Sequence, residues 1–472
     1  MKHKFVFLSV VVVLALAMLA CSIGDKTPTA VAPTDAPVKT EAPTEAPTEA
    51  PVKTEPPTQG GTGELTVVSA YGYQDSWDYY HVTGLIKNDS NKAVSEVELT
   101  IEMRDASGAT VLKNYDDNFV ESTTFNPMLT TLLPGESAPY DYYIYTDMVP
   151  ETFTVSVSGS LSGDATRAGV EVRNAQLIPG DNGTYAIVGE LINNSSTSAK
   201  INDLAGVILD GDGNVVAADW SYDMCNILQP SGDASGMDYA PFAITLDAPT
   251  DGSFTDWQVY IDAVETDTED VAPLYISFTN NYFDDFGDFH IVGVIENQGT
   301  DTYYTSLLGG VYDANGLVVD AGTVSVPLYI KAGEVVPFDV SYWNLVSWND
   351  EIAASIDTFT VQIDPYWTYT VDYDLVDLTN VTTTKDERSS GQISLGGTLV
   401  NDSGKALYNA TVVGYLMDAD DNLIAIQWTY VFPEGDAIAD GDSNNFEMTF
   451  WLDPAVDPNS LTISYMVQGD VK

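Results

Sequence analysis

The sequence predicts an all-β protein: four tandem antiparallel β-sandwich domains that follow a signal peptide and a disordered Pro/Thr-rich stalk. A Gly-x-x-x-Asn pattern begins at Gly84, Gly189, Gly293 and Gly397, at intervals of 105, 104 and 104 residues. Between these points apolar and polar residues alternate with a period of two, as in "EVELTIEM", and turn signals recur about every ten residues. A period near 104 suits an autonomous domain better than a solenoid coil.

Residues 1–20 are predicted to be a signal peptide. Lys2 and Lys4 precede an apolar run from Phe5 to Ala20, which is shorter than the ~20 residues needed to span a bilayer. Cys21 follows, and "MLAC" resembles the bacterial lipobox, in which a small residue precedes a cysteine that is lipidated and becomes the mature amino terminus. The resemblance implies a lipid on Cys21; an ordinary secretory signal or an uncleaved anchor is the alternative.

Residues 21–63 carry this cysteine and a predicted stalk. Its core, "APVKTEAPTEAPTEAPVKTEPPTQGGTG", is dominated by Ala, Pro, Thr and Glu, and its prolines forbid helix and favour extended polyproline II. At ~3.1 Å per residue such a segment reaches on the order of 100 Å. The stalk is therefore expected to hold the folded domains away from the lipid surface.

The four sandwich repeats are expected at residues 64–161, 168–265, 271–365 and 368–470. In each, an apolar strand after the Gly-x-x-x-Asn pattern ends in an aspartate, and a glycine usually stands three residues later. Aspartate followed by glycine at this spacing indicates a type I turn and hence a hairpin. The pairs are Asp105 and Gly108, Asp210 and Gly213, Asp313 and Gly316, and Asp418 with Asp421 in place of glycine.

The Gly-x-x-x-Asn pattern is interpreted as structural. Its glycine would let a neighbouring strand or the facing sheet approach closely, and its asparagine would begin a loop by bonding its own backbone. Four equivalent ligand sites are the alternative. Short strands with one wet face predict an immunoglobulin-like sandwich, although the Cys…Trp…Cys pattern of antibody domains is absent.

Composition excludes nucleic acid as a partner. The chain has 17 Lys and Arg against 70 Asp and Glu, a formal charge of -53, so phosphate backbones would be repelled. Its two cysteines are Cys21 and Cys225, so acylation of the first leaves no internal disulfide. Cys225 is expected to be a small buried apolar residue.

The order of motifs resembles the FxLYD domain of exported bacterial and archaeal proteins. The resemblance rests on the Gly-x-x-x-Asn pattern, the strand that ends in Asp, the following glycine, and "L-x-P/A-G-E" before "P-F/Y". The third repeat carries it best, with Tyr312, Asp313, Gly316, Gly333, Glu334, Pro337 and Phe338. It implies a β-sandwich on an extracytoplasmic protein and no catalytic residues.

No catalytic constellation is found in the sequence. Of three histidines, His3 belongs to the signal, while His81 and His290 lie at matching positions of separate repeats, three residues before the repeat glycine. Matching positions favour a place on a strand face over catalysis or metal ligation. No enzyme activity and no cofactor are therefore expected.

Two weaker patterns remain as candidate sites. "DGDGN" (Asp210, Asp212) and "DADDN" (Asp418, Asp420) resemble the start of a calcium loop, but the twelfth position lacks the glutamate of an EF-hand, so turns are the preferred interpretation. Exposed aromatic rings could stack on sugars. The candidate rings are Trp77, Tyr79, Tyr366 and Trp367.

The sequence therefore favours a non-enzymatic surface protein, anchored through the lipid on Cys21 to the outer face of the cell membrane or to the outer membrane. Its sandwiches would act as a spacer or as a module that binds another protein. A module that binds an extracellular glycan or another ligand, stabilised by calcium in one version, is the alternative.

Overall fold

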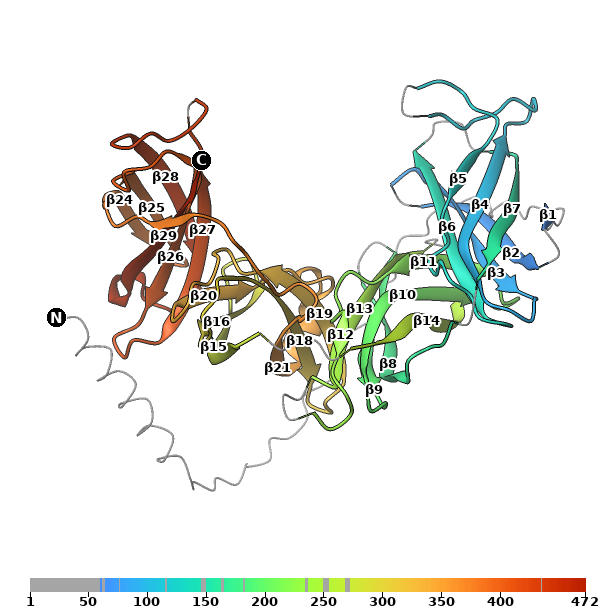
Figure 1. The fold of residues 1–472 in the computed structure, drawn as a ribbon, viewed down its shortest axis with the longest axis horizontal. Coiled ribbons are helices and arrows are strands. Elements are labelled where there is room, and N and C mark those ends of the chain that lie inside the picture. The colour runs from blue at the N-terminus through green and yellow to red at the C-terminus, as the bar shows by residue number, and fades with distance from the viewer. Residues whose placement is uncertain are drawn as a thin grey trace, which may run out of the picture. The chain divides into compact units, whose positions relative to one another are not determined.

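The fold consists of four tandem antiparallel β-sandwiches, as the sequence predicts (Figure 1). The structure, a computed structural model, describes residues 60–61, 64–75, 77–114, 117–145, 150–162, 165–180, 183–233, 237–248, 254–267, 272–433 and 435–472. The predicted signal peptide, Cys21 and all of the predicted stalk except residues 60–61 lie outside the described residues. Within them, no helix is long and apolar enough to cross a bilayer.

Each repeat has a three-stranded sheet, here called the first sheet, with the Gly-x-x-x-Asn strand at its centre. Repeat 1 has β2 (Leu65–Gln74), β3 (Tyr79–Asn88) and β6 (Ser137–Tyr145); repeat 2 has β8 (Val170–Pro179), β9 (Thr184–Asn193) and β13 (Tyr239–Asp247); repeat 3 has β15 (Leu274–Phe283), β16 (Phe289–Asn297) and β20 (Val335–Val340); repeat 4 has β24 (Val381–Ser389), β25 (Gln392–Val400) and β28 (Ser443–Trp451).

The second sheet of each repeat is built on the strand that ends at the turn aspartate. It contains β4 (Val94–Arg104), β5 (Thr123–Phe125) and β7 (Thr152–Leu161) in repeat 1; β10 (Ser198–Asp210), β11 (Val215–Trp220), β12 (Ile227–Leu228) and β14 (Phe254–Thr266) in repeat 2; β18 (Ser306–Asp313), β19 (Val318–Ser325) and β21 (Ile356–Ile363) in repeat 3; and β23 (Leu375–Asp377), β26 (Leu407–Met417), β27 (Leu423–Val431) and β29 (Thr462–Val471) in repeat 4.

Short elements complete the described chain. β1 (Gly60–Gly61) pairs in parallel with β7, and β17 (Tyr303–Tyr304) pairs with β22 (Tyr369–Thr370). The helices are η1 (Val346–Trp348), α2 (Asp350–Ser355) and η2 (Pro458–Ser460). The side chain of Asn349 caps α2 by accepting from the backbone N–H groups of Glu351 and Ile352.

The repeated glycine lies where a bulged strand and an aromatic ring approach its backbone. A Cβ on Gly189 would lie 3.0 Å from the ring of Phe242, its partner in β13, and 2.9 Å from the backbone of Ala175 in β8. Real Cβ atoms essentially never come that close to backbone, so the predicted close approach is confirmed. The other glycines also face an aromatic partner: Gly84 faces Tyr140, Gly293 faces Phe338 and Gly397 faces Phe446.

The repeated asparagine is fully buried and joins two loops. Nδ2 of Asn88 donates to the carbonyl oxygens of Lys92 at 2.7 Å and Leu132 at 2.9 Å, and its Oδ1 accepts from the N–H of Ser90 at 2.9 Å. The bonds within its own loop were predicted; the bond to the distant loop at Leu132 was not. The same pattern recurs at Asn193, Asn297 and Asn401.

Candidate functional site: the junctions between repeats

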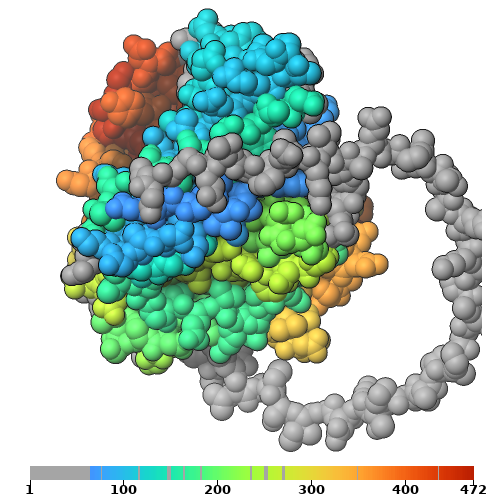
Figure 2. All heavy atoms as spheres, turned by 90° about the vertical axis from the view of Figure 1, so that its right-hand side faces the viewer, coloured from blue at the N-terminus to red at the C-terminus, as the bar shows by residue number. Residues whose placement is uncertain are grey.

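The second sheet of each later repeat packs its outer face against the first sheet of the repeat before it. In β10, Ala205, Val207 and Leu209 belong to a buried cluster that is otherwise formed mainly by residues of repeat 1. In Figure 2, atoms of repeat 1 lie against atoms of repeat 2. Corresponding contacts join β19 to β9 and β13, and β27 to β15, β16 and β20. β10, β18 and β19 are therefore buried on both faces over most of their length, whereas the alternating pattern had predicted one wet face. In β27, Trp428 and Tyr430 remain exposed.

A backbone carbonyl accepts a hydrogen bond from the preceding repeat at every junction. The three acceptors, Val215, Val318 and Leu423, begin the second strand of the hairpin, five residues after the turn aspartate. The bonds are Thr83 Oγ1 to Val215 O at 2.7 Å, Gln176 Nε2 to Val318 O at 2.8 Å, and Asn280 Nδ2 to Leu423 O at 3.3 Å. The acceptors are equivalent at all three junctions; the donors Gln176 and Asn280 lie on matching strands, β8 and β15, whereas Thr83 lies on β3.

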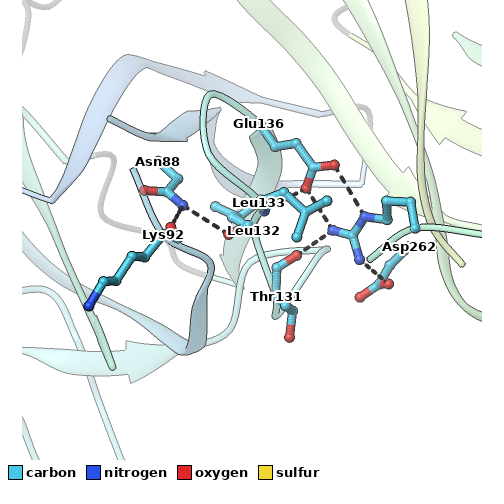
Figure 3. A network of polar contacts seen from close by, with 8 residues as sticks. Asn88, Lys92, Thr131, Leu132, Leu133, Glu136 and Asp262 are labelled. Atoms are coloured by element: carbon cyan, nitrogen blue, oxygen red, sulfur yellow. Dashed lines mark hydrogen bonds and ion pairs between the residues drawn. The ribbon is translucent and has the colours of Figure 1, made fainter. Parts of the chain in front are cut away.

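A second polar contact joins repeats 1 and 2 (Figure 3). Arg167 lies in the segment predicted to be the border between these repeats. Its guanidinium forms an ion pair with Asp262 of β14, donates to the carbonyl of Thr131 at 2.6 Å, and pairs with Glu136 at 2.7 Å. Both Thr131 and Glu136 belong to repeat 1. The border segment thus fixes one repeat against the next.

Matching contacts occur at the other two junctions. In β29, Gln468 occupies the position of Asp262, and its amide both accepts from the N–H of Tyr329 and donates to the carbonyl of Tyr329, each at 3.0 Å. After β21, Asp364 occupies the same position and accepts from the N–H of Asn226 at 3.4 Å. A polar side chain at one position therefore bonds directly to the preceding repeat at two junctions, and through Arg167 of the border segment at the first.

Burial dominates the electrostatics of the first junction. It raises the pKa of Asp262, and the nearby Arg167 only partly offsets this effect. Burial also raises the pKa of Asp203 to about 6, with the neighbouring charge of Asp262 as the next cause. Arg167 is the basic group that these carboxylates share, so its removal would leave buried negative charge without compensation.

The acidic turns bond to themselves. Oδ1 of Asp210 accepts from the N–H groups of Asp212 and Asn214, and Asp418 makes the same bonds to Asp420 and Asn422. For Asp418 the side-chain bond from Asn422, followed by bonds from backbone N–H groups, lowers the pKa. Among the described residues, no group of three His, Cys, Asp or Glu side chains is arranged to hold a metal ion.

The two histidines occupy matching places on β3 and β16. Nδ1 of His81 lies 2.9 Å from Asp141, and Nδ1 of His290 lies 2.8 Å from Asp339. Burial by itself would lower each imidazole pKa, but the carboxylates outweigh burial and raise the pKa of His81, and that of His290 to about 10. Each ring also stacks on a tyrosine: Tyr73 at 4.8 Å and Tyr282 at 4.6 Å between ring centroids.

The four candidate aromatic residues lie in two places. Trp77 and Tyr79 are exposed on repeat 1, where Tyr79 contacts Tyr143 and Tyr145 edge-on. Tyr366 and Trp367 are exposed after β21 and contact each other edge-on. Trp367 also lines a groove of about 340 Å³ that is formed by residues of repeats 2 and 3.

The thiol of Cys225 is buried, and burial raises its pKa, as expected for an apolar packing residue. Lipidation of Cys21 stays a prediction.

Sequence reasoning missed the junction residues, including Arg167, Asp262 and Gln468. One sequence feature could have indicated the junctions. Apolar and polar residues do not alternate in "LAGVIL", "LLGGVY" and "VVGYLM", and such continuous apolar runs predict strands that are covered on both faces.

No family model matches the chain, and no curated protein matches it. Among solved structures, red sea bream transglutaminase is similar at 15% identity over 39% of this chain and 27% of the other, with a TM-score of 0.13. Dimeric latent PorU from Porphyromonas gingivalis is similar at 11% identity over 76% and 40%, with a TM-score of 0.13. Native E. coli alpha-2-macroglobulin follows at 9% identity over 84% and 28%, with a TM-score of 0.11. The chain thus spans less than half the length of each of these proteins, and such low TM-scores add nothing to the description of the fold.

Proposed function

We propose that the chain is a non-enzymatic, lipid-anchored cell-surface protein of FxLYD-like repeats, whose β-sandwiches form a spacer with fixed junctions. The observation that carries this proposal is the recurrence, at all three junctions, of a hydrogen bond from the preceding repeat to the same backbone carbonyl position. A flexible string of domains needs no such recurrence. A spacer that holds a binding surface at a set distance from the membrane needs a similar contact at every junction, because bending at any one of them would change that distance.

The anchoring half of the proposal rests on the sequence around Cys21. We expect the mature protein to begin at Cys21 with an acyl-modified amino terminus, and mass spectrometry of the purified protein measures this directly. We also expect Cys21→Ala to release the protein from the membrane fraction. An unmodified terminus at another residue would contradict lipidation and leave the spacer half untouched.

The spacer half is tested by a distance distribution across one junction. In a background that carries Cys21→Ala and Cys225→Ala, spin labels on Ser107→Cys and Asp212→Cys report the distance between the exposed turns of repeats 1 and 2. Electron–electron resonance should give one narrow distribution, which Arg167→Ala broadens because it removes the ion pairs with Asp262 and Glu136. A broad distribution in the unaltered junction would contradict a fixed spacer.

A further inference from the structure

We propose that the groove between repeats 2 and 3 binds a neutral carbohydrate, with pyranose rings stacked against Trp367 and Tyr222. The two rings come from different repeats and line the same groove. Tyr222 is 78% exposed and Trp367 is 48% exposed, so both offer apolar ring surface to solvent. Flat, exposed rings beside polar groups are suited to the C–H faces of sugars.

The rings of the groove are held in place in the absence of a ligand. Nε1 of Trp367 donates to Oδ1 of Asn226 at 3.1 Å, which fixes the indole across the junction. The hydroxyl of Tyr304 bonds to Oγ of Ser325 at 2.6 Å, and its ring stacks on Tyr369 with centroids 5.1 Å apart. Trp367 and Tyr304 therefore have little side-chain entropy to lose on binding, which favours affinity.

The polar lining suits sugar hydroxyl groups. Ser306, Thr323 and Ser325 contribute hydroxyl groups, and Asn226 contributes an amide. The hydroxyl of Thr323 donates to Asp223 and that of Ser325 bonds to Tyr304, and each oxygen keeps a lone pair that can accept from a sugar O–H. Asp364 is 3% exposed and also lines the groove, while its Oδ1 accepts from the N–H of Tyr366 at 3.0 Å. Sugar hydroxyl groups need this mixture of donors and acceptors.

Charge selects a neutral sugar over an acidic one. None of the described residues that line the groove is basic, and the chain carries a formal charge of -53. The nearby Lys200 lies with Nζ 4.7 Å above the ring of Tyr366, outside the lining. Uronic acids or sulfated sugars would therefore meet repulsion without a compensating cation.

The tryptophan of this groove is particular to the junction of repeats 2 and 3. A smaller hollow, of about 180 Å³, lies at the junction of repeats 3 and 4, where Glu334 and Gln468 are among the lining residues. Strand register places Glu265 and Val471 at the positions that match Trp367 in the other two junctions. The shared packing that joins the repeats thus does not require an aromatic residue here. Trp367 bonds to Asn226 across the junction through Nε1, and the exposed part of its ring is available for a ligand.

Binding of soluble dextran, mannan and laminarin to the purified full chain, followed by tryptophan fluorescence and calorimetry, tests the proposal. We expect at least one to bind, Trp367→Ala to weaken binding by about tenfold or more, and Trp367→Phe to retain part of it. Trp428→Ala, which removes another exposed tryptophan, is the matched control and should change nothing. Melting temperatures verify that each variant is folded.

Three results would overturn the proposal. The first is no binding of any neutral polysaccharide, and the second is binding that Trp367→Ala and Tyr222→Ala both leave unchanged. The third is equal or tighter binding of alginate, an acidic polysaccharide, or of a proline-rich peptide that copies residues 33–58, which would assign the groove to another class of ligand. None of these results concerns Cys21 or the distances across the junctions. The proposed spacer function is therefore tested independently of carbohydrate binding.

Discussion

The asparagine of the Gly-x-x-x-Asn pattern recurs because its buried side chain makes hydrogen bonds that hold two loops together. Asn297 donates to the carbonyl oxygens of Asp301 and Ile330 and accepts from the N–H of Gly299. A shorter side chain would remove these three bonds, although the carbonyl oxygen of Ile330 would still accept from the N–H of Tyr303. The asparagine is therefore as much a part of the core as the aromatic residue that covers the repeat glycine.

We expect Asn297→Ala to lower the free energy of unfolding by about 1–3 kcal/mol, because buried polar groups lose their partners. Urea unfolding followed by fluorescence measures the change. The control is Asn315→Ala in an exposed turn of the same repeat, where a change within about 0.5 kcal/mol is expected. Equal effects of the two substitutions would show that the cross-link contributes no special stability.

His290 should make the stability of the chain depend on pH. Its pKa is raised to about 10 in the folded protein, above the ordinary value of 6.5, since Asp339 and Asp284 favour the charged imidazolium. The folded state thus holds the proton more tightly, so this stabilisation is complete below pH 6.5 and is lost as pH rises toward 10.

Comparison of wild type with His290→Gln at pH 6 and pH 10 isolates this contribution. The wild type should lose on the order of a few kcal/mol more than the variant over that range, measured from urea midpoints. Other groups titrate alike in both proteins, so the difference belongs to the histidine. A pH dependence that is the same in both would contradict the proposed ion pairs.

At the scale of elements, the hairpin turns are closed by their own aspartates. Gly108, Gly213 and Gly316 have positive φ angles of 82°, 80° and 75°, and Asp421 adopts 64° at the same place. With the aspartate oxygens already accepting backbone N–H groups, a cation would have to displace those bonds.

We therefore expect millimolar CaCl₂ to raise the melting temperature no more than NaCl of equal ionic strength. Both salts screen repulsion among the carboxylates, with a Debye length of ~10 Å at 0.1 M. Differential scanning fluorimetry makes the comparison. A calcium-specific increase that disappears in Asp418→Ala or Asp210→Ala would contradict the interpretation of these segments as plain turns.

The strands and turns could be predicted because they depend on residues close together in the sequence. The junctions could not, because their contacts join residues from different repeats. The turn at Asp313 and the strand at Gly293 follow from residues within a few positions of each other. Arg167 acts through Thr131, Glu136 and Asp262, which are separated by up to 95 residues from it, and no local pattern reports such contacts. The groove at Trp367 was foreseen only as an aromatic cluster, since Tyr222 comes from another repeat.

At the scale of the whole chain, the described repeats differ by position. β4 of repeat 1 places Glu98 and Glu102 on its outer face, exposed, where β10 places Val207 against a neighbour. In repeat 4, Asn445 and Glu447 are exposed on the outer face of β28. Polar outer faces on the first and fourth repeats, with apolar faces between, are typical of arrays whose stability depends on neighbouring units.

Calorimetric unfolding of residues 64–472 tests most directly whether the repeats depend on one another. Fixed junctions predict that neighbouring repeats unfold together, with a van't Hoff enthalpy well above the roughly 70 kcal/mol expected of one 100-residue domain. Val207→Asp, which buries a charge between repeats 1 and 2, should split off a separate transition at lower temperature. Four independent transitions, each with the enthalpy of a single domain and none altered by Val207→Asp, would contradict the account.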